Sequence, residues 1–396
     1  MSNAHRAGRG WAVLGLGALV VIGWALLPSR EEPAGDAREA VPAAPRQPAP
    51  ETADRTPPAP EPAGEPDSSI GAETPRREAS AECAPATDSE PSTARTIGMP
   101  AASDLAAVSA RIVGSSDPEH LAAAALLAET PAERIDHIAR AIERGRDNPV
   151  VVWIAVRLCS DVLSDESRDA DCPMQEWERG LLRLDNQNSE AWILVAANRL
   201  RRGETDTALE AMQIAAAAPV TNEYFAESVA MLQRAVAAAG GYSFREQALI
   251  AFGVAAATPL PSYADYLRMC TEQAETDRLW AEACLEYGRL AERQSTTIIG
   301  RAVSQTIQEA ALDAMGYDAS EVVARREAER RAQIASVTLG TPELVLESPA
   351  RLASFLTLLK EQGEWSANAR MQEEAARMQE QDRQAGRGST EATECR

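Results

Sequence analysis

Lysine and histidine are nearly absent from this sequence. Lys360 is the single lysine, and only three histidines occur among 396 residues. The chain also lacks a His-Glu-x-x-His zinc motif, a Gly-x-Ser-x-Gly nucleophile elbow, a Ser-x-x-Lys motif and a glycine-rich phosphate loop. His120 and His137, the two histidines beyond the N-terminal region, fit polar groups on helix surfaces. We therefore expect no catalytic residue, no cofactor and no metal ion.

Positive charge is scarce as well. The formal net charge is −21, and no basic cluster is present. Binding to nucleic acid needs a basic surface, so this class of partner is excluded. The basic residues are nearly all arginine, and the chain is rich in alanine, glycine and proline. This bias is typical of a GC-rich bacterial genome.

Aromatic residues make up 4% of the chain, and runs of alternating polar and apolar residues are missing. Ala, Leu, Glu, Arg and Gln dominate from about residue 101, and these residues favour helices. A polar cap directly before proline marks several helix starts. The sequence therefore predicts an all-α domain over 101–383, followed by a flexible tail, 384–396. Such starts occur at Asp117-Pro118, Thr130-Pro131, Asn148-Pro149 and Ser348-Pro349.

One long uncharged run stands near the N-terminus. Trp11–Leu27 has seventeen residues without a charge, enough to cross a thin hydrocarbon core as a helix. Arg6 and Arg9 precede it and favour a cytoplasmic stub over 1–10. We expect a transmembrane helix in the bacterial inner membrane, with the main domain in the periplasm. A cleaved signal peptide is the alternative, although no Ala-x-Ala-like cleavage site follows Leu27.

Residues 28–100 read as a linker. Fifteen of the 24 prolines fall here, and large apolar residues are almost missing. Such a segment buries too little surface to offset its ordering entropy, so we expect a disordered Pro/Ala/Glu-rich spacer between membrane and domain.

An internal repeat appears in the second half of the chain. ALEAMQIAAAAP at 208–219 and ALIAFGVAAATP at 248–259 share seven identities at an offset of 40 residues. A fixed period of this size indicates stacked helical hairpins. Small residues let neighbouring helices approach closely, and Met212 and Phe252 take the same large apolar position.

The stretch 189–219 resembles a tetratricopeptide repeat. Gly203 and Pro219 fall at or within one residue of that family's glycine and proline, whereas Ala196 and Arg199 replace its usual glycine and tyrosine. The further matching positions are Trp192, Ala208, Met212 and Ala215. The resemblance implies an α-solenoid whose concave face binds a protein or peptide.

Six cysteines all lie beyond the apolar run, and an oxidising compartment favours disulfides among them. Cys159 and Cys172 sit at adjacent ends of one predicted hairpin, as do Cys270 and Cys284 in another. We predict that both pairs form disulfides. Cys83 and Cys395 flank the domain; they pair with each other, link two chains into a homo-oligomer, or stay free.

The expected function is that of a membrane-anchored periplasmic scaffold or adaptor that binds a protein or peptide partner. The region 276–316 and the first helices of the repeats supply the residues of the partner surface. Two alternatives stay open: a cell-wall-active enzyme, or an activator of one, which needs a buried carboxylic acid, and a structural spacer or oligomer. The partner surface is predicted to include Trp192, Arg199, Tyr224, Tyr287, Arg289 and Arg293.

Overall fold

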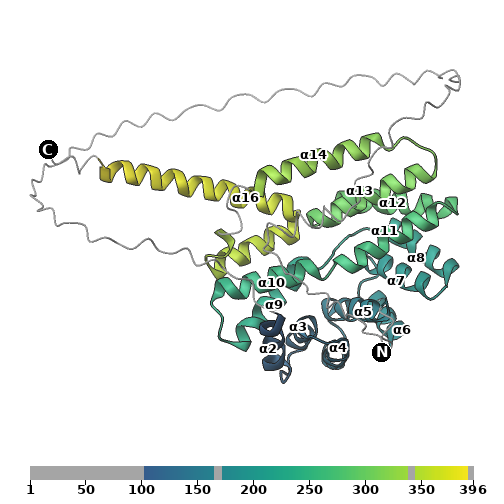
Figure 1. Cartoon of the computed structure of the whole chain (residues 1–396), viewed down its shortest axis with the longest axis horizontal. Coiled ribbons are helices and arrows are strands. Elements are labelled where there is room, and N and C mark those ends of the chain that lie inside the picture. The colour runs from purple at the N-terminus through teal and green to yellow at the C-terminus, as the bar shows by residue number, and fades with distance from the viewer. Residues whose placement is uncertain (1–101, 165–171, 338–343, 391–396) are drawn as a thin grey trace, which may run out of the picture. The chain divides into compact units, whose positions relative to one another are not determined.

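The computed structural model describes residues 102–164, 172–337 and 344–390, and every regular element in these ranges is an α-helix (Figure 1). A single isolated parallel bridge joins Asn188 and Val220. The predicted all-α class is thus confirmed for this part of the chain. The helices are α2 (Ala102–Ile112), α3 (Pro118–Leu127), α4 (Pro131–Gly145), α5 (Pro149–Ser164), α6 (Met174–Leu184), α7 (Ser189–Arg201), α8 (Thr205–Ala217), α9 (Phe225–Ala239), α10 (Phe244–Ala257), α11 (Leu260–Ala274), α12 (Arg278–Gln294), α13 (Ile298–Ala314), α14 (Ser320–Val337) and α16 (Pro349–Thr390).

The expected apolar segment 11–27, the linker 28–100 and the cysteines Cys83 and Cys395 lie outside the described residues. Within the described ranges, no helix combines the length and the apolar character that crossing a membrane requires.

Helix starts follow the capping residues that the sequence predicts. Asp117 caps α3, and Thr130 with Glu133 forms a capping box at the start of α4. The Asn148 side chain accepts hydrogen bonds from the first turn of α5, and the Ser348 hydroxyl accepts one from Arg351. These side chains satisfy amide groups that have no partner within the helix.

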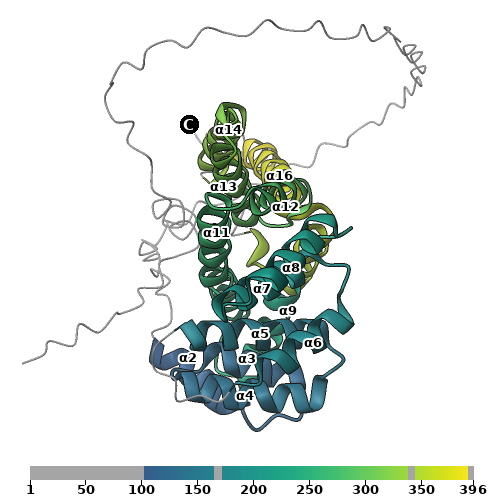
Figure 2. The same ribbon diagram turned by 90° about the vertical axis from the view of Figure 1, so that its right-hand side faces the viewer.

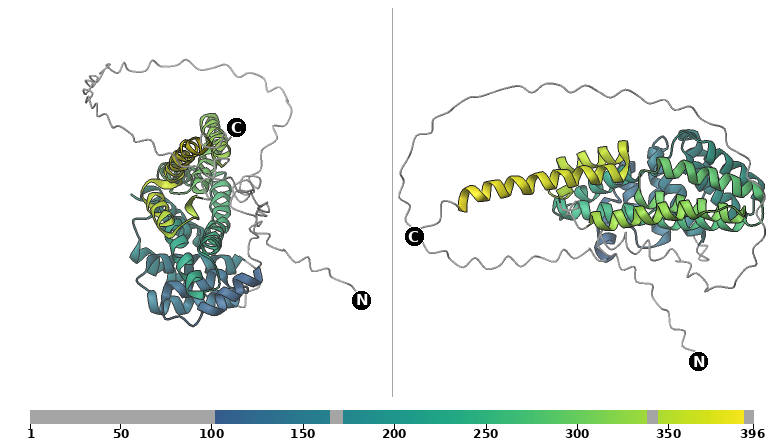
Figure 3. Two further views of the ribbon diagram at one scale, coloured as in Figure 1. Left: turned by 90° about the vertical axis from the view of Figure 1, so that its left-hand side faces the viewer. Right: turned by 90° about the horizontal axis from the view of Figure 1, so that it is seen from above.

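The C-terminal helix α16 has a sharp break at Gly363, whose φ of 78° is left-handed and suits glycine. The break divides α16 into halves at 349–362 and 364–390. Arg351 in the first half contacts Glu374 and Met378 in the second, so the two halves form a helical hairpin. The C-terminal end of α16 extends past the other helices (Figure 3). It runs to Thr390, into the stretch expected as a tail.

Neighbouring helices pair as hairpins: α3 with α4, α7 with α8, α9 with α10, and α12 with α13. The repeated residues lie on the inner faces of α8 and α10. Ala208, Met212, Ala248 and Phe252 are all buried. The repeated small residues therefore serve close helix packing, as the pattern predicts.

Packing beyond the hairpins does not follow the chain order. The helix α8 packs on α12, whereas the α9–α10 hairpin turns back so that α9 packs on α2, α3 and α16. The helix α11 contacts both α5 and α7 (Figure 2). The described residues thus combine hairpin stacking with contacts between helices far apart in sequence.

Candidate functional site

A pocket with a volume of about 270 Å³ opens between α7 and α11. Apolar side chains and ion-paired side chains line it together. The lining residues are Ala197, Leu200 and Arg201 of α7, and Asp265, Arg268, Met269, Glu272 and Gln273 of α11. The α7 side belongs to the unit that resembles a tetratricopeptide repeat.

Two arginines hold one carboxylate at this pocket. The Asp265 carboxylate lies 3.3 Å from Arg201 Nη1 and 2.5 Å from Arg268 Nη2. Arg268 is 56% exposed, whereas the Asp265 side chain is only 16% exposed. At this pocket the Asp265 carboxylate is therefore largely shielded from solvent, whereas the Arg268 guanidinium is accessible.

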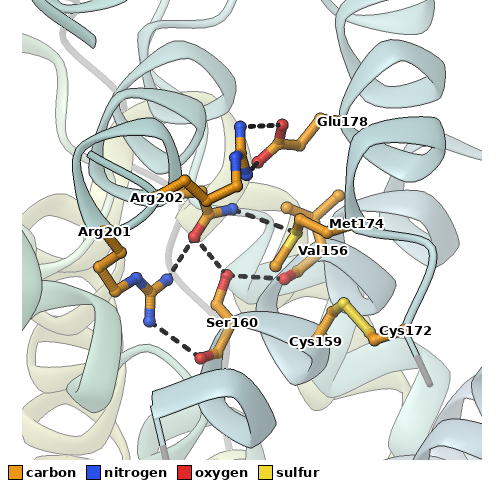
Figure 4. Close-up of a disulfide and its surroundings, with 9 residues drawn as sticks. Val156, Cys159, Ser160, Cys172, Met174, Glu178, Arg201 and Arg202 are labelled. Carbon is orange, nitrogen blue, oxygen red and sulfur yellow. Dashed lines mark hydrogen bonds and ion pairs between the residues drawn. A yellow bond between two sulfur atoms is a disulfide. The ribbon is translucent and has the colours of Figure 1, made fainter. Parts of the chain in front are cut away.

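Arg201 is fixed from the other side by the end of α5 (Figure 4). Its Nη1 donates to the Ser160 carbonyl at 2.9 Å, and its Nη2 donates to Asn198 Oδ1. The Ser160 hydroxyl lies 2.7 Å from Asn198 Oδ1 and 2.8 Å from the Val156 carbonyl oxygen, so its single proton can be donated to either acceptor. The direction of Arg201 therefore depends on where α5 ends.

The end of α5 also carries the first disulfide. Cys159 and Cys172 form a bridge with Cα atoms 5.9 Å apart, and Cys270 and Cys284 form a second bridge with Cα atoms 5.7 Å apart. Both cysteine pairs lie at disulfide distance, as their places in the hairpins predict. The first bridge lies directly beside Ser160 (Figure 4).

Asp161, near the end of α5, is a further carboxylic acid close to this pocket. It is half-buried, and the pKa of its carboxyl is raised to about 6 because burial disfavours the charged form. The positive charges of Arg157 and Arg201 oppose this shift, and the negative charge of Asp265 adds to it. Asp161 and the arginine-bound Asp265 are thus two acids close enough for their charges to interact.

A second polar cluster lies in the interior between α5, α7 and α11. Arg157 is 1% exposed, and its guanidinium stacks 4.6 Å from the centre of the Trp153 ring. Its Nη2 donates to the Thr258 carbonyl at 2.8 Å, and its Nη1 lies 3.7 Å from Glu190 Oε1. The Tyr266 hydroxyl donates to the same Glu190 oxygen at 2.9 Å.

Glu190 is buried, and the pKa of its carboxyl is raised to about 8. Loss of water around the charged form is the main cause, opposed by the positive charge of Arg157. Arg157, Glu190 and Tyr266 are each 1% exposed or less, so the cluster is closed to solvent. Its geometry ties three helices together rather than presenting a group to a ligand.

The predicted partner residues Trp192 and Arg199 lie half-buried on α7. Trp192 Nε1 donates to the Asn186 carbonyl at 2.8 Å, and Arg199 Nη1 donates to the Thr207 carbonyl at 3.0 Å. Both side chains stabilise the hairpin that carries them. Arg199 is close in sequence to Leu200 and Arg201 but does not line the pocket.

Tyr224 and Tyr287 are both 4% exposed. The Tyr224 hydroxyl donates to Asp185, and its ring packs 5.5 Å from that of Trp153. Arg289 and Arg293 are exposed on α12, and Arg289 pairs with Glu286 at 2.8 Å. The six residues are not gathered into one surface patch: two lie on α7, two are interior and two are exposed on α12. Their part in binding stays a prediction.

His120 and His137 have polar neighbours at the surface of α3 and α4. His120 Nδ1 lies 3.2 Å from the Ser115 hydroxyl, and His137 Nδ1 lies 3.3 Å from Asp136 Oδ2. No group of three or more His, Cys, Asp or Glu side chains among the described residues has a metal-binding arrangement.

Arg157, Asp161 and Asp265 are not among the site residues that the sequence predicts. A signal for the first was present: Arg157 is the one charge in the run Val150–Ser160, which is otherwise almost entirely apolar. A charge in such a run indicates a buried partner. Nothing local marks Asp265, because α11 places it opposite α7 only through tertiary packing.

Comparison of the chain with protein-family models, with curated proteins and with solved structures found no match.

Proposed function

We propose that this protein is a membrane-anchored periplasmic scaffold that holds a protein partner, and that the α7–α11 pocket receives an extended segment of that partner. The pocket is the observation that carries the proposal. Recognition sites usually combine apolar contact with fixed polar groups, and this pocket joins three apolar residues to five polar or charged ones. The finer assignment to tetratricopeptide-like stacking rests on the unit 189–219, whose α7 forms one wall.

The lining supports a peptide segment as the ligand. Leu200 and Met269 offer apolar contact for one side chain of the segment. Arg268 and Gln273 at the rim offer donors for its carbonyl groups, and the exposed Glu272 offers an acceptor for its amide groups. Since Asp265 is already held by two arginines, the pocket presents no unpaired charge from that residue, and peptide binding there need not displace an ion pair.

Site-specific photo-crosslinking in native membranes tests the proposal. A photoreactive residue replaces Arg268 at the rim, and matched variants carry it at Arg289 on α12 and at Glu210, an exposed position on α8. We expect one recurring periplasmic partner from position 268 and none from 210. Crosslinks from position 289 alone would place the partner surface on α12 instead.

A cell-wall hydrolase is the second candidate, and Asp161 is the observation that favours it. A carboxyl whose pKa is raised to about 6, beside a second carboxyl that two arginines hold, is an arrangement that general acid catalysis uses. Release of soluble fragments from labelled cell wall, compared between the wild type and Asp161→Asn, tests this candidate. Equal release by both proteins, or none by the wild type, would reject it.

A further inference from the structure

Three segments of the chain meet at the turn between α12 and α13. The turn is Ser295–Thr297, and Thr297 caps α13 by accepting a hydrogen bond from the Gly300 amide. Glu223 approaches from the segment before α9, and Glu364 approaches from the break in α16. Two carboxyl groups thus converge on one helix start.

Glu223 is bound tightly at this turn. Its carboxylate accepts hydrogen bonds from the Ser295 hydroxyl at 2.6 Å, the Thr296 hydroxyl at 3.2 Å and the Thr297 amide at 3.1 Å. The Tyr263 hydroxyl of α11 donates a fourth at 3.1 Å. These four donors at a helix N-terminus favour the charged form of Glu223, but the loss of water on burial outweighs them and raises the pKa of its carboxyl.

Glu364 has a poorer environment for a charge. Its Oε2 accepts one hydrogen bond, from the Ile298 amide at 2.7 Å, and its own amide donates to the Thr296 carbonyl at 2.7 Å. The pKa of Glu364 is raised to about 7, mainly because its carboxyl loses water, and the negative charge of Glu223 adds to the shift. The pKa of Glu223 itself is also raised by burial, so both carboxyls resist a second negative charge.

The other charged groups near this junction are paired at its rim. Lys360 Nζ in the first half of α16 lies 3.0 Å from Glu227 Oε1 of α9. The donors that α11, the turn and α13 present to the two acids are uncharged: a phenol, two hydroxyls and two backbone amides. The charge of Lys360 is thus matched by Glu227, and the hydrogen-bond donors are neutral, so none of these groups offsets a negative charge on Glu364.

The junction holds an apolar cover in place. The first half of α16 buries Leu352, Phe355 and Leu359. The Phe355 ring lies 5.9 Å from that of Phe252 on α10, in an edge-to-face arrangement. Lifting the hairpin would therefore uncover an aromatic face on the α9–α10 hairpin.

We propose that the hairpin formed by the two halves of α16 is a strap latched at Glu364, closed at acidic pH and released as the pH rises through neutrality. When Glu364 is protonated, it meets Ile298 and Glu223 without a second charge. When it loses its proton, the docked strap holds two like charges at one turn, whereas the released strap exposes Glu364 to water. Docking is therefore weakened by deprotonation.

Lys360 supplies a single-site reporter of the strap. It is the only lysine of the chain, it is 63% exposed, and it lies in helix, which a lysine-specific protease cleaves only after local opening. Cleavage of the full-length protein is followed from pH 5.5 to 8.5 and divided by the rate on a synthetic peptide of residues 355–366. With a pKa near 4.5 in the released state and about 7 when docked, the normalised rate should rise about 30-fold.

Two matched variants decide the outcome. Glu364→Gln keeps an acceptor for the Ile298 amide but carries no charge, so its rate should stay low and vary less than about 3-fold over the same range. Glu373→Gln, at an exposed position on the same hairpin, should keep the wild-type rise. Circular dichroism at pH 5.5 checks that all three proteins have equal helix content.

A normalised cleavage rate of the wild type that stays constant from pH 5.5 to 8.5 would overturn the proposal. So would a Glu364→Gln variant that keeps the wild-type pH dependence, or one that is cleaved fast at every pH, because the latch would then be independent of charge.

Discussion

At the scale of single residues, Gly300 shows how closely a side chain and a helix backbone can approach. A Cβ atom built on Gly300 would lie 1.7 Å from Glu223 Oε1, so any side chain would displace that carboxylate from the turn. Gly180 on α6 differs, because its nearest neighbour would be Val152 Cγ1 at an ordinary 3.6 Å.

We expect Gly300→Ala to lower the free energy of unfolding by about 3 kcal/mol, since overpacking is joined by loss of hydrogen bonds to Glu223. Gly180→Ala should instead raise it by about 0.5 kcal/mol through helix propensity. Urea denaturation of both variants measures the difference. Similar values for the two would show that Glu223 can move without cost.

Glu190 should make stability depend on pH. Its pKa in the folded protein is about 8, above its ordinary value of 4.5, so the folded state binds the proton more tightly. This contribution is complete below pH 4.5 and is lost as the pH rises toward 8.

Glu190→Gln keeps an acceptor for the Tyr266 hydroxyl and removes the titration. Relative to the wild type, the variant should gain stability progressively between pH 4.5 and 8, by a few kcal/mol in total. Unfolding free energies at four pH values measure this trend. The unfolding free energy of Glu210→Gln, at an exposed position on α8, should change with pH as that of the wild type does. The same pH dependence in Glu190→Gln would contradict the prediction.

At the scale of elements, caps and bridges decide where helices begin and which ends meet. Asn188 caps α7 by accepting from the Glu190 amide at 3.1 Å. It also accepts from the Asn222 amide at 2.9 Å and donates to the Asn222 carbonyl at 2.9 Å. One side chain thus joins the start of α7 to the segment that leads into α9.

Asn188→Ala should cost about 2 kcal/mol of unfolding free energy, because it leaves buried backbone groups unsatisfied as well as removing a cap. Asp277→Ala, which removes the exposed cap of α12, should cost about 1 kcal/mol. Thermal and urea unfolding of the two variants test the order. A larger loss from Asp277→Ala would show that the link to Asn222 contributes little.

The second disulfide closes the α11–α12 hairpin across a sequence separation of 14 residues. Replacing both Cys270 and Cys284 by serine should cost about 3 kcal/mol, because the unfolded chain regains the freedom of that loop. Unfolding of the variant and of the wild type under non-reducing conditions gives the value. A loss below about 0.5 kcal/mol would mean that native contacts or residual structure offset the loop entropy.

At the scale of the whole described region, contacts between distant helices should couple its unfolding. In a linear repeat array each unit touches only its neighbours. Here α9 packs on α2 and α3, so part of the stability of the early helices depends on residues more than one hundred positions away.

Leu232→Ala, at a fully buried position on α9, should therefore lower hydrogen-exchange protection in α3 as well as in α9. Leu181→Ala on α6 is the matched control: α6 packs on α5 and α7, so the protection of α9 should change less. Loss of protection confined to α9 and α10 after Leu232→Ala would indicate that the α9–α10 hairpin unfolds by itself.

Local chemistry in the sequence determined the helical class, the capped starts at Asp117, Thr130, Asn148 and Ser348, and both cysteine pairings. Propensity, capping and short loop closure act over a few residues, so they can be read along the chain. The small residues of α8 and α10 likewise showed which helix faces are buried.

Tertiary structure alone decided which helices meet. It turned the α9–α10 hairpin back onto α3, placed Asp265 opposite Arg201, and brought Glu364 to the turn that Glu223 already occupies. It also buried Tyr224 and Tyr287, which the sequence offered as surface residues. Amphipathic helices specify that a face is to be covered but not by which partner, and that choice depends on the packing of all the helices together.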